Sequence, residues 1–201
     1  MDIVAEREWI VARFAEVRAP ERNLDAGAEA LIPAAVLVPI VEREFGLNVI
    51  LTRRTAHLRD HAGQISFPGG RIETSDRSST DAALREAQEE IGLAPDRVEL
   101  LGRLPMYRTG TGFLVHPVVG LVDSRASLRP DPFEVDEIFE VPLDFVLDPA
   151  NHMHHNVEHD GRHYRLYAIP YGEYYIWGAT AGILRDLYQM LSQAASATGG
   201  L

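Results

Sequence analysis

The stretch GGRIETSDRSSTDAALREAQEEIGL, residues 69–93, constrains the fold of this chain more than any other. A glycine pair opens a polar loop, and the loop leads into a segment rich in carboxylates. Ser78 or Ser79 is a suitable N-cap for a helix, and Gly92 suits the left-handed position that follows a helix end. We therefore predict a short helix that begins near these serines and ends at Ile91.

Three glutamates share one stripe of this helix, because Glu86, Glu89 and Glu90 are spaced at i, i+3 and i+4. Side chains at this spacing have Cβ atoms about 5–6 Å apart, so their charges repel unless a cation lies between them. Oxygen ligands suit a hard divalent ion such as Mg²⁺ or Mn²⁺. The three glutamates are therefore candidate metal ligands, against the usual role of such a cluster as a solvated helix face.

The surroundings of these glutamates favour a functional site. Arg85 lies one turn before Glu89 and can orient its carboxylate, while Asp76 can support the junction between loop and helix. The opposite stripe is apolar and is expected to pack on the core. It consists of Leu84, Ala87 and Ile91.

Together these residues resemble the Nudix box, whose family pattern is G-x5-E-x7-R-E-U-x-E-E-x-G-U with U apolar. Gly70, Asp76 and residues 85–93 follow this pattern with two departures. Asp76 replaces a glutamate, and eight residues rather than seven separate it from Arg85. The resemblance implies an α+β protein with the Nudix fold, a mixed β-sheet sandwiched between α-helices.

The resemblance also implies roles for the residues of the box. Glu86 and Glu90 would be the main metal ligands, and Glu89 a third ligand or the base that acts on the attacking water. Arg85 would hold Glu89 or Glu86 in a fixed rotamer by a charge-assisted hydrogen bond. The carbonyl group of Gly69 would be a further ligand by analogy with the family.

The sequence before the box resembles the coenzyme A pyrophosphatase branch of the family. The signature of that branch, L-L-T-x-R-[S/A]-x3-R-x3-G-x3-F-P-G-G, is followed by residues 50–70. Ile50 and Thr55 are mild departures from it. The extra residue before Arg85 is also a habit of this branch.

This resemblance implies metal-dependent hydrolysis of coenzyme A, and of acyl or oxidised forms of it, to 4′-phosphopantetheine and adenosine 3′,5′-bisphosphate. It implies Arg54, Arg59, Gly69 and Gly70 as candidate substrate-binding residues. A Nudix pyrophosphatase acting on another nucleoside diphosphate derivative, such as ADP-ribose, is the alternative. A non-catalytic binding module is disfavoured, because the arginine and the glutamates of the box are all present.

Nudix enzymes often recruit one further carboxylate from a downstream loop, as a metal ligand or as a base. Glu134 and Glu137 are the candidates for this position, and the sequence does not choose between them. An exposed strand edge is the alternative interpretation of this acidic segment.

Histidine and aromatic residues are concentrated in the last third of the chain. We predict a hairpin over residues 151–171 with its turn at Asp160-Gly161. His152 and His154 would share a strand face, but no cysteine or carboxylate completes a metal site around them. Core packing is the expected role of the aromatic side chains, with stacking on adenine as the alternative. These side chains are Tyr164, Tyr167, Tyr171, Tyr174, Tyr175 and Trp177.

The length of 201 residues suits one domain over residues 1–201. We predict an amphipathic helix at residues 2–18, with Ile3, Ile10, Phe14 and Val17 on one face, and a C-terminal helix at residues 179–194. Pro39 suggests that its strand is an edge strand or contains a bulge. The predicted strands cover residues 34–41, 47–52, 65–67, 98–104, 113–122 and 133–141.

Composition excludes several classes of function. The net charge of −11 disfavours binding to nucleic acid or to an anionic membrane. All 19 basic residues are arginines and there is no cysteine, which excludes a P-loop lysine, disulfides and thiolate metal sites. No apolar run is long enough for a membrane span, and the start of the chain does not have the pattern of a signal peptide. We expect a soluble, cytoplasmic protein with a small-molecule substrate, and the sequence leaves its oligomeric state open, a homodimer included.

Overall fold

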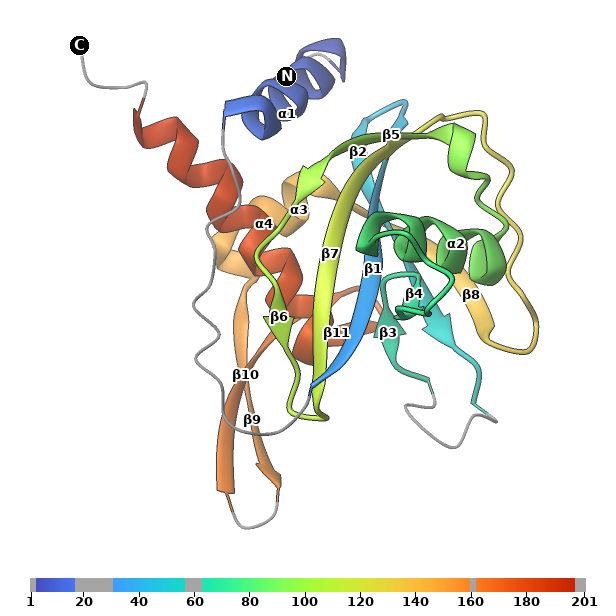
Figure 1. Ribbon diagram of the computed structural model, residues 1–201. Helices are drawn as coiled ribbons and strands as arrows, with labels where there is room; N and C mark the ends of the chain where they lie inside the picture. The colour runs from blue at the N-terminus through green and yellow to red at the C-terminus, as the bar shows by residue number, and fades with distance from the viewer. Residues whose placement is uncertain (1–2, 17–30, 57–62, 160–161, 198–201) are drawn as a thin grey trace.

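The computed structural model describes residues 3–16, 31–56, 63–159 and 162–197. An 8-stranded sheet forms the centre of this part of the chain (Figure 1). Strands β1 and β7 are parallel, whereas the other pairs are antiparallel, so the sheet is mixed. Its main row is β3 (Ile65–Ser66), β2 (Gly46–Arg54), β1 (Ile32–Arg43), β7 (Phe113–Val122) and β5 (Val98–Arg103). Three strands pair with this row, namely β4 (Gly69–Arg71) with β1, β6 (Tyr107–Arg108) with β7, and β8 (Val135–Pro142) with β2.

Every predicted strand overlaps one of these strands, but the position expected for Pro39 is wrong. Its strand, β1, lies inside the sheet and not at an edge. On one side, Pro39 is in register with Gly120 of β7. On the other side, the pairing with β4 ends at Val36 and the pairing with β2 begins at Ile40. Pro39 has no N–H to donate. It lies in the gap between β4 and β2, so neither of these pairings loses a hydrogen bond.

Helix α2 (Ser79–Ile91) covers one face of the sheet, as predicted from its caps. The Ser78 hydroxyl accepts a hydrogen bond from the Asp81 N–H at 3.1 Å, which satisfies one of the free donors at the helix start. Gly92 ends the helix in the left-handed conformation with φ 67°. The buried residues of the helix include Ala82, Ala83, Ala87 and Ile91.

The other face is covered by α1 (Ile3–Glu16), α4 (Gly178–Ala197) and the short helix α3 (Leu143–Leu147), as Figure 1 shows. Alternation along β1 divides the core between the two faces. Val38 belongs to the cluster that contains Leu184 and Leu187 of α4, whereas Leu37 belongs to the cluster that contains Ala87 of α2. The sheet is therefore sandwiched between helices, as expected.

The terminal helices agree with the sequence pattern in the described residues. Ile10 and Phe14 of α1 are buried, as predicted, while Val17 lies outside the described residues. Five large apolar residues of α4 are buried. They are Ile183, Leu184, Leu187, Met190 and Leu191. No helix in the described part of the chain is both long and apolar enough to cross a membrane.

A smaller sheet has the order β11–β10–β9 and packs beside α4. Its strands are β9 (Met153–His159), β10 (Arg162–Tyr171) and β11 (Tyr174–Trp177). The predicted hairpin is confirmed by the antiparallel pairing of β9 with β10, and its turn lies outside the described residues. His152 precedes β9, where its Nε2 lies 2.7 Å from the carbonyl oxygen of Val146. The expectation that His152 shares a strand face with His154 is therefore wrong, because the strand begins one residue later.

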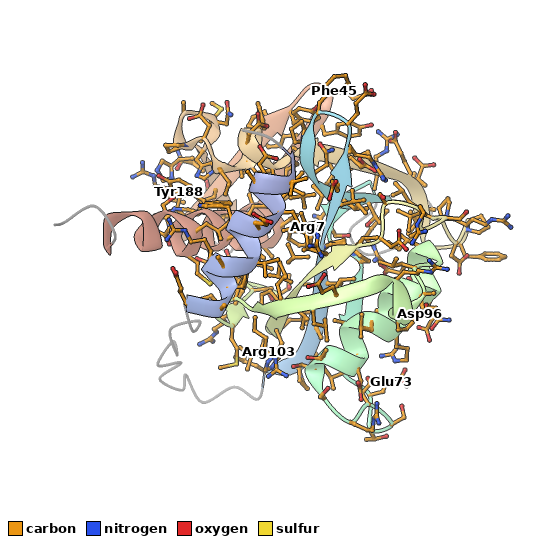
Figure 2. The ribbon with its side chains drawn as sticks, turned by 90° about the horizontal axis from the view of Figure 1, so that it is seen from above. Arg7, Phe45, Glu73, Asp96, Arg103 and Tyr188 are labelled. Carbon is orange, nitrogen blue, oxygen red and sulfur yellow. The ribbon has the colours of Figure 1, made fainter. Side chains whose placement is uncertain are left out.

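The loop of residues 72–78, here called the box loop, connects β4 to α2. Glu73 in this loop and Phe45 in the turn between β1 and β2 lie at opposite ends of the molecule in the view of Figure 2. The fold thus places the glycine pair of β4, the box loop and α2 together on one face of the sheet.

We predict that Ser78→Ala lowers the free energy of unfolding by about 1 kcal/mol, because it removes the N-cap of α2. Chemical denaturation measures this change. Ser79→Ala is the matched control, since Ser79 is the first residue inside the helix, and we expect a change within about 0.5 kcal/mol. Equal losses in both variants would contradict the assignment of the cap.

Candidate active site

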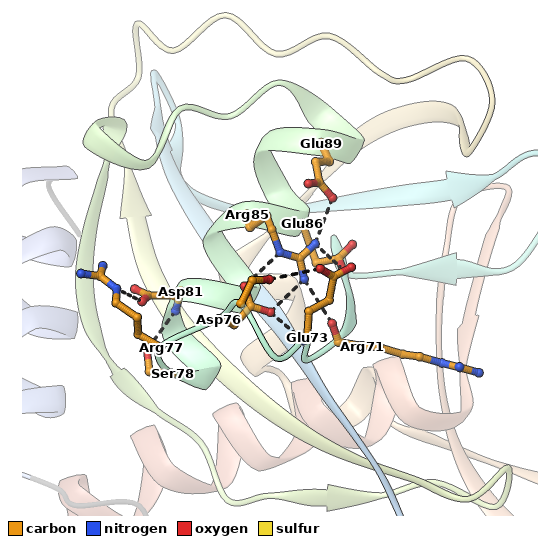
Figure 3. A network of polar contacts seen from close by, with 10 residues as sticks. Arg71, Glu73, Asp76, Arg77, Ser78, Asp81, Arg85, Glu86 and Glu89 are labelled. Atoms are coloured by element: carbon orange, nitrogen blue, oxygen red, sulfur yellow. Dashed lines mark hydrogen bonds and ion pairs between the residues drawn. The ribbon is translucent and has the colours of Figure 1, made fainter.

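Arg85 is the centre of a polar network that joins the box loop to α2 (Figure 3). Its Nε and Nη2 donate to the two carboxylate oxygens of Asp76, each at 3.0 Å. Its Nη1 donates to Glu86 Oε1 at 2.9 Å and to Glu89 Oε2 at 3.0 Å. Nη2 also donates to the carbonyl oxygen of Arg71 at 3.2 Å. One guanidinium therefore fixes the end of β4, the box loop and two glutamates of the helix.

This network sets the charge state of its members. The hydrogen bonds from Arg85 hold the pKa of Asp76 below its usual value, and the N–H of Glu73 contributes in the same direction by donating at 2.8 Å. The hydrogen bond to Asp76 in turn raises the pKa of Arg85. Asp76 thus stays ionised at the junction of loop and helix, in the place where the sequence pattern expected it.

Glu90 is the most deeply buried carboxylate of the box, with 4% of its surface exposed. Its Oε2 accepts a hydrogen bond from the N–H of Gly69 at 3.1 Å, and its Oε1 lies 3.7 Å from Nη1 of Arg54. Burial raises the pKa of Glu90 to about 8, because the charged form is costly away from water. The N–H of Gly69 therefore contacts Glu90, and the metal-binding role expected for the Gly69 carbonyl stays a prediction.

Glu86 lies directly against the glycine pair. A Cβ atom on Gly70 would lie 2.5 Å from the carboxylate of Glu86, and one on Gly69 would lie 2.5 Å from the carbonyl oxygen of Ala35. Glycine is required at position 69, where a Cβ would meet backbone atoms, whereas a Cβ on Gly70 would displace the carboxylate of Glu86. Burial raises the pKa of Glu86, in opposition to its hydrogen bond with Arg85.

Glu89 differs from the other two glutamates, because its side chain is 60% exposed. No three His, Cys, Asp or Glu side chains within the described residues are arranged closely enough to hold a metal ion. In this side-chain arrangement Arg85 binds Glu86 and Glu89, while Glu90 turns toward Gly69. The assignment of Glu86, Glu89 and Glu90 as metal ligands stays a prediction.

Glu134 is the downstream carboxylate that acts on the site. Its charge raises the pKa of both Glu86 and Glu90. The loop that carries it is attached to the end of β2, because Thr55 N–H donates to the carbonyl oxygen of Glu134 at 3.0 Å. The Thr55 hydroxyl donates to the carbonyl oxygen of Phe133 at 3.1 Å. Sequence reasoning missed this role of Thr55 and treated the residue only as a mild departure from the signature.

Glu137 does not belong to the candidate site. Its Oε1 accepts a hydrogen bond from the Tyr174 hydroxyl at 2.8 Å, and its Oε2 pairs with Nη2 of Arg53 at 2.6 Å. Between the two downstream candidates that the sequence left open, the structure therefore places Glu134, and not Glu137, beside the carboxylates of α2.

Arg53 and Arg54, which follow the strand predicted at residues 47–52, belong to β2. Pairing with β8 continues through these residues, with a register shift between them that leaves Asp136 as an extra residue. Arg54 lies beside Glu90, and its buried Nε has no hydrogen-bond partner within the described part of the chain. Arg59 lies outside the described residues.

The donor set of the site fits a hard divalent cation. Glu86, Glu90 and Glu134 offer only oxygen atoms, which are the ligands of Mg²⁺ and Mn²⁺. Mutual repulsion and burial raise the pKa of Glu86 and Glu90, and a bound cation opposes both effects.

Comparison with known proteins decides the family. The sequence matches the NUDIX domain family over residues 31–160. It is 42% identical over 159 residues to the protein named uncharacterized Nudix hydrolase NudL of Pectobacterium atrosepticum, which covers 79% of this chain and 82% of the relative. The chain belongs to the Nudix hydrolase family. The protein of the same name from Cronobacter sakazakii is 44% identical over 155 residues, which cover 77% of this chain and 80% of the relative.

Solved structures confirm the expected Nudix fold. An Ap4A hydrolase binary complex from C. elegans is similar with a TM-score of 0.52 at 15% identity, covering 81% of this chain and 99% of that one. A MutT/nudix family protein from Enterococcus faecalis has a TM-score of 0.52 at 16% identity, covering 96% and 75%. Divalent metal ions are generally used by Nudix hydrolases, in agreement with the donor set described above.

We predict that Arg85→Lys lowers the free energy of unfolding by about 1–3 kcal/mol. Lysine keeps the charge but cannot form the fork that satisfies Asp76, whose side chain is only 5% exposed. Chemical denaturation measures the loss. The control is Arg77→Lys, because Arg77 is 88% exposed and its salt bridge with Asp81 contributes little. Equal stabilities of Arg85→Lys and the control would contradict the structural role of the fork.

Proposed function

We propose that this Nudix hydrolase is a metal-dependent pyrophosphatase that cleaves coenzyme A into 4′-phosphopantetheine and adenosine 3′,5′-bisphosphate. The observation that carries the proposal is that residues of the signature and of the box lie together around one carboxylate. Arg54 and Gly69 come from the signature that resembles the coenzyme A branch, and Glu90 comes from the box. The N–H of Gly69 donates to Oε2 of Glu90 at 3.1 Å, and Nη1 of Arg54 lies 3.7 Å from Oε1 of the same carboxylate.

The residues divide the work of diphosphate hydrolysis between them. Glu86, Glu90 and Glu134 are the proposed metal ligands. A divalent cation bound here would neutralise the negative charge of the diphosphate and would lower the pKa of a bound water molecule. Glu89 is the candidate base, since it is exposed and held by Arg85. It also remains a candidate third ligand after movement of its side chain.

Arginine residues are suited to hold the substrate in this chain, which contains no lysine. The guanidinium of Arg54 can bind two phosphate oxygens at once by its planar fork. Its position beside Glu90 would place a diphosphate against the carboxylates. Gly69 and Gly70 leave room for this approach, because they have no side chains. Arg59 is proposed as a further contact on the basis of the signature alone.

Product identification tests the proposal. Purified protein is incubated with coenzyme A or ADP-ribose, each with Mg²⁺, with Mn²⁺ and with a chelator, and products are separated and identified by mass spectrometry. We expect phosphopantetheine and adenosine 3′,5′-bisphosphate only when a metal is present. Preferred cleavage of ADP-ribose would reject coenzyme A as the substrate and keep the metal-site argument. Cleavage of neither compound would favour a binding module.

We predict that Glu90→Gln lowers metal-dependent turnover by about a hundredfold or more, because it removes a ligand charge worth several kcal/mol. The amide oxygen can still accept the hydrogen bond from Gly69, so the fold should be kept. Steady-state kinetics and circular dichroism measure the two effects. Glu44→Gln is the control, since Glu44 lies exposed in the turn between β1 and β2. A fully active Glu90→Gln protein would overturn the assignment.

We predict that Gly70→Ala lowers turnover at least about tenfold. The added methyl group would lie 2.5 Å from the carboxylate of Glu86 and must displace it, and small displacements in an active site are costly. Kinetic assays with saturating metal measure the loss. Gly110→Ala is the matched control, because a Cβ at Gly110 has no neighbour within 4 Å. The steric argument fails if both variants keep full activity.

A further inference from the structure

A cleft of about 430 Å³ lies beside the candidate active site, between β2 and the small sheet. This volume falls in the range of roughly 300–1,000 Å³ that is typical of small-molecule sites. The cleft is lined chiefly by Arg53, Gln64, Glu173, Tyr174, Tyr175 and Trp177. None of these side chains has a role in the carboxylate site.

Two aromatic rings are presented to this cleft in fixed positions. Tyr175 is 46% exposed, and its hydroxyl is 2.8 Å from Nδ1 of His155. Trp177 is partly exposed and lies 5.2 Å from the same imidazole ring. Tyr174 differs from them, because its ring stacks on Phe139 at 3.7 Å. Tyr175 and Trp177 are therefore the rings that a ligand can contact.

The walls of the cleft are held together by the fold. Trp177 pairs in register with Ala168 of β10, which fixes the end of β11. The buried hydroxyl of Thr180, at the start of α4, donates to the carbonyl oxygen of Ile65 in β3 at 2.9 Å. This bond joins the aromatic wall to the edge of the large sheet. A ligand that enters the cleft would thus meet a preformed surface, which reduces the entropy lost on binding.

The charges of the cleft favour an uncharged, planar group over a phosphate. The guanidinium of Arg53 is already paired with Glu137 at 2.6 Å and with Asp136 at 3.3 Å. Glu173 adds a negative charge to the opening. A phosphate would find no unpaired cation among these residues. Flat rings, an amide and a carboxylate are instead the groups that stack on a nucleobase and bind its amino group.

The cleft and the carboxylate site are connected through strand β2. Arg53 and Arg54 are consecutive, so their Cα atoms are about 3.8 Å apart and their side chains point to opposite faces. Arg54 reaches Glu90, whereas Arg53 lines the cleft. The Arg54 N–H donates to the carbonyl oxygen of Gln64, a residue of the cleft, at 2.9 Å, so both sites lie at the edge of the sheet where β3 pairs with β2. A nucleotide whose diphosphate lies at Arg54 can therefore place its base in the cleft.

We propose that the cleft of Arg53, Tyr175 and Trp177 binds the nucleobase of the substrate, with its ring against the two aromatic side chains. The exocyclic amine of adenine would donate to Glu173, and the amide of Gln64 can donate to or accept from the ring edge. This inference rests on the proposed function, since it assigns a subsite for part of a nucleotide substrate. The experiment below separates the failure of one from the failure of the other.

Trp177 provides a direct readout, because the chain has 2 tryptophans and Trp9→Phe leaves Trp177 as the single one. The Trp9→Phe protein is titrated with AMP in the presence of a chelator, and tryptophan fluorescence is recorded. We expect saturable quenching by AMP and none by ribose 5-phosphate, which lacks the base. Trp177→Phe, which keeps Trp9, corrects for absorption by the nucleotide and should show no specific quenching.

A second variant tests the stacking contact. In the Trp9→Phe background, Tyr175→Ala should raise the Kd for AMP about tenfold, as expected for loss of one aromatic partner of a base. Phe45→Ala is the matched control, because Phe45 is 94% exposed and lies in the turn between β1 and β2. This control should leave the Kd unchanged.

The outcomes distinguish the two ideas. Quenching by AMP without cleavage of any nucleotide would keep the subsite and reject the proposed function. Cleavage of coenzyme A without AMP quenching, and with an unchanged KM in Tyr175→Ala, would reject the subsite alone. Quenching by 4′-phosphopantetheine but not by AMP would also overturn the proposal, because the cleft would then hold the other half of the substrate.

Discussion

Arg85 donates hydrogen bonds to Asp76 in the box loop and to Glu86 and Glu89 on its own helix, so one guanidinium joins both halves of the candidate site. The loop could otherwise move relative to α2, because polar loops have few buried contacts to hold them. Arg85 also binds the carbonyl of Arg71 at the end of β4, the strand in which Gly70 lies against Glu86.

The buried carboxylates work against the stability of the fold. Glu90 is almost fully covered, and only one N–H and a nearby guanidinium oppose the cost of its charge. Its raised pKa is the direct sign of that cost. A chain selected only for stability would place an apolar side chain at this position. The arrangement is typical of a functional site, where charge is held ready for a ligand of opposite sign.

Features that depend on near neighbours in the chain were predictable. The Ser78 cap, the Gly92 end and the apolar stripe of α2 follow from helix periodicity, which any isolated helix obeys. Features that depend on the order and pairing of the strands were not predictable from the sequence. Pro39 indicated an edge strand or a bulge, yet it lies in an interior strand between the segments that pair with β4 and with β2. Arg53 and Arg54 extend a strand that composition alone would end.

The sequence by itself determined the family, the helix that carries the glutamates and the residues of the box, because these are encoded in local spacing. Only the tertiary structure decided that the charge of Glu134 raises the pKa of Glu90 while Glu137 is bonded to Tyr174, and that Tyr175 and Trp177 face a cleft while the ring of Tyr174 stacks on Phe139. Such choices depend on which face of a strand each side chain occupies after β8 and β11 have packed. A register shift of one residue reverses those faces, and strand pairing between distant segments sets that register.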